Sequence, residues 1–140
     1  MRMAVPGIAR LRRGTALVEM AIVLLLLMLL TLGAIEYGWM FLKQEQITNA
    51  ARQASRLACT PDATNAQVTT QISRLMSSYG MASSGYTTTL TPNDVSAAGR
   101  GETVTVQISV TYKKVGITNF ALLPMPAKLS SAVVMEKEGP

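Results

Sequence analysis

The sequence predicts an α+β fold with a long N-terminal transmembrane helix, a second short helix and a small C-terminal antiparallel sheet. Three observations lead to this fold class. Residues 20–35 are apolar and contain no charged side chain. Residues 36–58 continue with helical spacing and without proline. The last third of the chain contains short runs in which apolar and polar residues alternate, as in half-buried strands.

The uncharged run at residues 20–35 forms the centre of the long helix. Its sixteen residues span about 24 Å at 1.5 Å per residue, slightly less than a ~30 Å hydrocarbon core. Including residues 15–18 closes this gap, but it places Glu19 inside the span. A carboxylate costs about 3 kcal/mol at mid-bilayer and less near an end. Glu19 is therefore a candidate functional residue.

The helical pattern continues beyond the apolar run. Apolar residues recur at helical spacing at Ile35, Trp39, Leu42, Ile47, Ala50, Ala54 and Ala58. The last three form an alanine stripe, and a row of small residues at this spacing lets another element approach closely. The stripe packs either against the chain's own domain or against another subunit, and both contacts can hold at once.

Residues near the two ends of this second helical stretch have simple interpretations. Tyr37 and Trp39 lie where an interfacial aromatic belt is expected. Glu36, at the outer end of the span, is predicted to be solvated by headgroups and water. Cys59, the only cysteine, is interpreted as a small apolar residue near the helix end. The following proline predicts that the helix ends near Thr60, because the residue before a proline avoids the α region.

Shorter elements are predicted in residues 61–140. A helix is expected at residues 65–79, with Val68, Ile72, Leu75, Met76 and Tyr79 on one face. Strands are expected at residues 86–91, 102–112 and 128–137, and the second of them alternates most clearly. Turns at residues 92–94 and 99–101 and a proline-broken connection at residues 120–126 would join these elements into an antiparallel sheet.

The charge distribution indicates a membrane segment rather than a nucleic-acid-binding surface. Of thirteen lysines and arginines, four precede Gly14 with no acid among them, namely Arg2, Arg10, Arg12 and Arg13. The positive-inside rule then places the N-terminus in the cytoplasm. The chain has no histidine, the commonest general base and metal ligand. We therefore predict no catalytic residue, metal, cofactor, small-molecule substrate or nucleic-acid partner.

A recognisable motif opens the apolar helix. The basic pair at residues 12–13 precedes Gly14, and Glu19 follows five residues after the glycine. This arrangement resembles the type IV prepilin processing motif. The stretches at residues 14–21, 33–38 and 48–56 narrow the resemblance to the TadE-like family of tight-adherence (Flp-type) pilus pseudopilins. Residues 129–136 are similar more loosely, and Met20 stands where the family usually has phenylalanine.

The resemblance implies that a membrane-embedded prepilin peptidase cuts between Gly14 and Thr15. Cleavage would leave Thr15 with a free α-amine, which is cationic near neutral pH. Glu19 would lie one helical turn away on the same face. In pilins, such a glutamate is thought to neutralise the amine of a neighbouring subunit and to set the register of docking. Pairing of Glu19 with the amine of its own chain is the alternative.

The sequence thus predicts a structural assembly subunit of a tight-adherence pilus or secretion system, with a part in adhesion or secretion, and not an enzyme. Its domains would be a cleaved basic leader at residues 1–14, a transmembrane and amphipathic helix at residues 15–60, and a small exported α+β domain at residues 61–140. The chain would cross the bacterial cytoplasmic membrane once, with its C-terminus exported. Its partners would be lipid, the peptidase, other pilins or pseudopilins and the assembly machinery.

Two other classes of protein are weighed against this one. A Sec signal peptide with its apolar core at residues 20–32 and cleavage after Gly33 would release a small secreted binding domain. Two observations argue against a signal peptide. Glu19 interrupts the apolar residues that lead into the core, and the helical pattern continues past Glu36. A twin-arginine signal would have an apolar pair after the arginines, whereas glycine, threonine and alanine follow the arginines here. A membrane-bound hydrolase would need a histidine or a G-x-S-x-G elbow, and the sequence has neither.

Overall fold

The computed structural model describes the backbone of residues 8–117 and 124–138 and the side chains from Gly14 onward. The chain divides into two compact units, residues 1–37 and residues 38–140. Helix α1, Ile8–Ala58, contributes to both units. Arg2 and most of the predicted connection at residues 120–126 lie outside the described residues.

The first unit contains the N-terminal part of α1. The helix begins at Ile8, so it already includes the end of the basic leader and passes through Gly14 without a break. The apolar run satisfies its own backbone hydrogen bonds as a helix, which a segment in lipid must do. The Thr31 hydroxyl also finds a partner inside the helix, since its Oγ1 donates to the Leu27 carbonyl oxygen at 2.8 Å.

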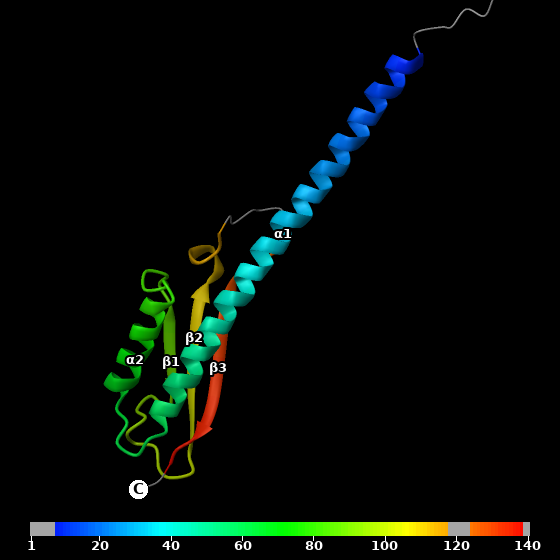
Figure 1. Cartoon of the computed structure of the whole chain (residues 1–140). Coiled ribbons are helices and arrows are strands. Elements are labelled where there is room, and N and C mark those ends of the chain that lie inside the picture. The colour runs from blue at the N-terminus through cyan, green and yellow to red at the C-terminus, as the bar shows by residue number, and fades with distance from the viewer. Residues whose placement is uncertain (1–7, 118–123, 139–140) are drawn as a thin grey trace, which may run out of the picture. The chain divides into compact units, whose positions relative to one another are not determined.

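Within its described residues, the second unit joins the end of α1 to one further α-helix, three strands and a short 3-10 helix (Figure 1). These elements are α2 (Asn65–Ser78), β1 (Thr87–Thr91), β2 (Thr103–Thr111), η1 (Tyr112–Lys114) and β3 (Lys128–Glu136). The strands form an antiparallel sheet in the order β1-β2-β3. The predicted fold class is confirmed. The predicted boundaries of α2, of the three strands and of the C-terminal end of α1 lie within two residues of the observed ones, whereas α1 begins at Ile8, seven residues before the predicted start at residue 15.

The core of the second unit lies between the helices and the central strand. Strand β2 buries every second side chain, namely Val104, Val106, Ile108 and Val110, as its alternation predicts. Val106 pairs with Leu90 of β1 and with Val133 of β3. The α1 residues of this core are mostly small, which lets the helix lie close to the sheet.

The apolar residues that recur along α1 at helical spacing do not all lie on one buried face. Ile35 and Leu42 are 52% and 47% exposed. Ile47 is fully buried. Leu42 and Ile47 are five residues apart, or about 140° around a helix, so they cannot share one face. The stripe that begins at Ile47 is the buried one, and residues with the opposite phase face outward.

Helix α2 has a capping motif at its N-terminal end and a glycine after its C-terminal end. Thr64 and Gln67 form a capping box: the Gln67 N–H donates to Thr64 Oγ1 at 3.4 Å, and Gln67 Oε1 accepts from the Thr64 N–H at 2.9 Å. Gly80 follows the helix with a φ of +69°, a conformation that favours glycine. Between these ends α2 buries Val68, Ile72 and Met76 of the predicted apolar face. The other two predicted residues, Leu75 and Tyr79, are partly buried against the same core.

Lys137 fastens the C-terminal end of α1 to the rest of the second unit. Its side chain is 5% exposed, and its Nζ donates to the carbonyl oxygens of Ala58 at 3.2 Å and Val95 at 2.9 Å. The backbone N–H of Glu138 donates to the Cys59 carbonyl oxygen at 2.9 Å. An ammonium group at the last helical carbonyls also complements the helix dipole. Sequence periodicity gave no indication of this contact.

We expect Lys137→Met to destabilise the second unit by about 2 kcal/mol, because two buried carbonyl oxygens lose a charged donor. Urea denaturation of the full chain in detergent, followed by the fluorescence of Trp39, the only tryptophan, would measure the change. Lys128→Met is the matched control, since Lys128 is exposed and its loss should change stability by less than about 0.5 kcal/mol. Equal effects of the two substitutions would contradict the proposed role of Lys137.

Candidate processing and membrane site

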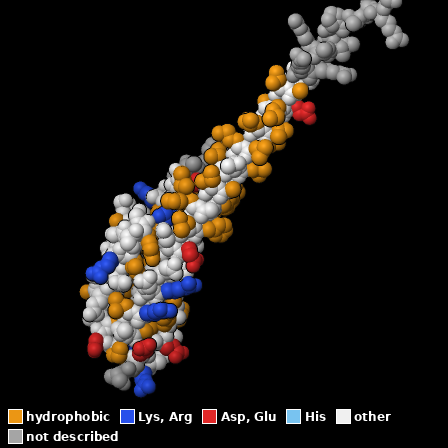
Figure 2. Space-filling view, viewed as in Figure 1, with side chains coloured by type: hydrophobic (Ala, Val, Ile, Leu, Met, Phe, Trp, Pro, Cys, Tyr) orange, Lys and Arg blue, Asp and Glu red, His pale blue; other side chains and the backbone are white. Residues whose placement is uncertain are grey.

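The N-terminal part of α1 presents an apolar surface (Figure 2). Its large exposed hydrophobic residues are Leu17, Val18, Met20, Ile22, Val23, Leu24, Leu25, Leu26, Leu27, Met28, Leu30 and Ile35. Contiguous apolar surface of this kind marks a contact with a membrane or with another protein. Among the residues that the structure describes, α1 is the one helix long and apolar enough to cross a membrane. The helix therefore fits a single-pass membrane protein.

The fold does not require a glycine at position 14. Gly14 is exposed in the helix, and a Cβ added there would meet no atom within 4 Å. Its backbone has the ordinary helical conformation, in which glycine costs about 1 kcal/mol relative to alanine. Any requirement for glycine here would have to come from a partner that binds the backbone closely. The glycine also weakens the helix at the predicted cleavage point.

Thr15 and Glu19 are exposed on the same helix. Four residues separate them, so they lie one above the other on one face. In the full-length chain the Thr15 nitrogen is a neutral peptide nitrogen. Glu19 can therefore gain a cationic neighbour at this position only after the leader is removed. Gly14, Thr15 and Glu19 were all identified from the sequence, and all three are exposed in the structure.

Glu36 departs from its predicted environment. The sequence placed it among headgroups and water, but the structure buries it, with 1% of its surface exposed. The solvated interpretation of Glu36 is therefore wrong. Glu36 lies seven residues before the buried Lys43 and eleven before Ile47, so it continues the buried stripe of α1 towards the N-terminus. A charge at such a position is tolerated only when it has partners, and Glu36 is not without one.

Two polar side chains near the start of the second unit connect α1 to its surroundings. The Trp39 indole Nε1 donates to the Val115 carbonyl oxygen at 2.7 Å. The Lys43 Nζ lies 4.9 Å from the centre of the Trp39 ring and donates to the Tyr79 carbonyl oxygen at 2.9 Å. Trp39 is predicted to lie in an interfacial aromatic belt. In the structure its indole N–H links α1 to Val115, the residue after η1. Sequence reasoning missed Lys43, although its place in the buried stripe was visible in the spacing.

The alanine stripe lies in the core. Ala50, Ala54 and Ala58 are each 0% exposed and pack within the second unit. Of the two contacts that the sequence left open, packing against the chain's own domain describes these residues. No surface remains at these positions for a neighbouring subunit in the folded chain.

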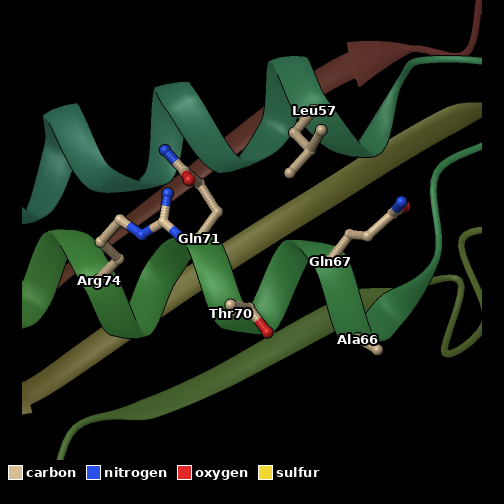
Figure 3. A pocket seen from close by; sticks show the side chains of 6 residues that line it. All are labelled: Leu57, Ala66, Gln67, Thr70, Gln71 and Arg74. Atoms are coloured by element: carbon tan, nitrogen blue, oxygen red, sulfur yellow. The ribbon is translucent and has the colours of Figure 1, made fainter.

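A shallow groove of about 370 Å³ lies between the end of α1 and α2 (Figure 3). It is lined by Leu57, Ala66, Gln67, Thr70, Gln71 and Arg74. Figure 3 shows Gln71 and Arg74 extending from α2 into the gap between the helices. The lining offers hydrogen-bond donors and acceptors but no nucleophile paired with a base. In the described ranges, no group of three His, Cys, Asp or Glu residues could hold a metal ion.

Cys59 is buried, as the sequence suggested. Its side chain is 4% exposed, and burial raises the pKa of its thiol, an effect that the nearby Lys137 only partly opposes. Thiolate is the reactive form of cysteine. A raised pKa lowers the thiolate fraction near neutral pH, so burial and protonation both make this thiol unreactive.

Comparison with known proteins places the candidate site inside a family match. Residues 14–56 match the family described as TadE-like protein. No curated protein and no solved structure matches the chain. The family match confirms the predicted resemblance over this segment, which starts at Gly14 and includes Glu19.

We expect Cys59 to react with a maleimide at least tenfold more slowly in the folded chain than in urea, because the thiol is buried and its pKa is raised. Mass spectrometry of timed samples at pH 7 would give both rates. A Ser83→Cys variant with Cys59→Ala supplies an exposed thiol on the same unit as a control. Labelling of Cys59 as fast as that control would contradict its burial.

Proposed function

We propose that this chain is a TadE-like pseudopilin, a structural subunit without enzymatic activity that takes part in assembling a tight-adherence pilus or secretion system. A prepilin peptidase would remove residues 1–14. The observation that carries this proposal is the group Gly14, Thr15 and Glu19 at the head of an exposed apolar helix, within the family match. The glycine is not needed by the fold, which supports a role in recognition by a protease.

The proposed location is the bacterial cytoplasmic membrane, with the second unit exported. The four arginines before the span support a cytoplasmic N-terminus. After Gly14 the chain has nine basic and eight acidic residues, so little charge opposes export of the remainder. Proposed partners are lipid around the apolar helix, the peptidase at Gly14, and other pilins, pseudopilins and assembly proteins along α1.

A small secreted binding domain is the second candidate. The division of the chain favours it, because the second unit begins at Gly38 and would remain after signal cleavage behind Gly33. The apolar helix would then be lost. The two candidates differ in the mature N-terminus, which is Thr15 for the pseudopilin and Ala34 for the secreted domain.

We expect the mature protein to begin at Thr15 and Gly14→Leu to leave the full-length precursor in the membrane, because a side chain at Gly14 obstructs close approach to the backbone. N-terminal sequencing and intact mass would test both points. Gly38→Leu is the matched control, since a Cβ at Gly38 also meets no atom within 4 Å, and it should be processed normally. A wild-type chain that begins at Met1 or Ala34 would contradict the proposal.

We expect Glu19→Gln to insert and to be processed, but to lose its partner pilins on purification. Removing the carboxylate eases insertion by up to ~3 kcal/mol, and the cleavage site is unchanged. What is lost is the charge that pairs with the new amine of Thr15. Membrane level, N-terminal sequence and partner recovery should be compared with wild type and with Asp62→Asn, an exposed acid of the second unit. Normal partner recovery by Glu19→Gln would show that Glu19 does not set the docking register.

A further inference from the structure

The outward side of α1 within the second unit carries charges that the chain itself does not pair. Glu45, Arg52 and Arg56 are exposed. At 100° per residue they lie within about 40° of one another around the helix. No hydrogen bond or ion pair joins their side chains to another residue in the described part of the chain. Figure 2 shows acidic and basic side chains following one another on the face in view.

These charged side chains do not stabilise α1 by ion pairs within the helix. Arg52 and Arg56 are four residues apart, a spacing at which like charges repel. Glu45 precedes Arg52 by seven residues, or about 10 Å along the axis, instead of the three or four residues at which a helix forms ion pairs. The acid is thus too far from either arginine for pairing within one chain.

The same side of α1 also exposes apolar surface. Phe41 lies one turn before Glu45 and is 65% exposed, and Leu42 beside it is 47% exposed. An exposed aromatic residue combined with arginines is typical of the composition of protein interfaces. We define the docking stripe as Phe41, Glu45, Arg52 and Arg56.

We propose that the docking stripe binds the docking stripe of a second copy of this chain, in parallel and with an axial stagger of about 10–16 Å. This shift corresponds to the seven residues from Glu45 to Arg52 and the eleven from Glu45 to Arg56. It brings the carboxylate of one copy beside both arginines of the other. Without a stagger, acid would face acid and arginine would face arginine.

The parallel direction rests on the proposed function, because two copies anchored by their N-terminal helices in one membrane point the same way. An antiparallel pair would also match the charges, but it would send the two anchors in opposite directions. The staggered contact uses Glu45 of one copy and the arginines of the other. The remaining charges lie on the side of each helix that the contact already covers, so the arrangement is a pair.

Disulfide cross-linking distinguishes these arrangements. In a Cys59→Ala background, Gly38→Cys and Asn49→Cys place single thiols eleven residues apart, close to the docking stripe. The two full-length variants, with different tags, would be oxidised together in detergent, where no bilayer fixes their depth. We expect the mixed 38–49 dimer to exceed both the 38–38 and the 49–49 dimers.

Charge reversal tests the specific pairing. Glu45→Lys alone, or Arg52→Glu with Arg56→Glu, should lower the mixed dimer about threefold, as for exposed ion pairs. The triple variant should restore it, because the reversed charges are complementary again. Arg74→Glu, an exposed charge of α2, is the control and should change nothing. Raising the salt concentration should weaken the wild-type contact.

Three results would overturn the proposal: no dimer, a dominant 49–49 dimer, which indicates an antiparallel or unstaggered pair, or failure of the triple variant to restore the mixed dimer. Intact mass of the same samples reports processing separately. A chain that begins at Thr15 and does not form the mixed dimer refutes the staggered contact alone. A chain that begins at Ala34 refutes the proposed function.

Discussion

Helix α1 has to be stable in two different environments along its length. Along the first unit, α1 exposes apolar side chains in all directions, which suits lipid or neighbouring apolar helices. Along the second unit, the same helix buries one face and exposes the other to water. A helix satisfies its backbone hydrogen bonds within its own segment in both settings, so it can continue from one to the other. The remaining elements are arranged around its second half.

This constraint explains the composition of the buried face. Because α1 packs against the side chains of a three-stranded sheet, its buried residues between Ile47 and Ala58 are alanine, serine and isoleucine. Two larger polar residues lie on this face nearer the membrane segment, and both are buried: Glu36 and Lys43. The Lys43 Nζ donates to Gln46 Oε1 at 3.2 Å and to the Tyr79 carbonyl oxygen at 2.9 Å, so the buried ammonium group has hydrogen-bond partners within the second unit.

Local patterns were sufficient to predict the elements, and long-range contacts were not. The alternation at Val104–Val110 identified β2, and the proline at position 61 identified the end of α1, because each signal depends only on neighbouring residues. The burial of Glu36 and the capping of α1 by Lys137 depend on residues far apart in the sequence. Periodicity gives a helix its faces, but it does not say which face the rest of the chain covers. For the candidate site, Gly14 and Glu19 were identified by their spacing, whereas Lys43 was missed.

The fold itself separates structural residues from candidates for function. Lys137, Trp39 and the alanine stripe each have a partner inside the second unit, so packing and hydrogen bonding account for them. Gly14 is a glycine without a steric reason, and Glu19 is an acid in an apolar segment. Each lowers the stability of the isolated helix or its affinity for lipid. Residues that lower stability and have no compensating contact inside the chain are explained by what the chain binds, and here both lie in the N-terminal part of α1, which exposes apolar surface.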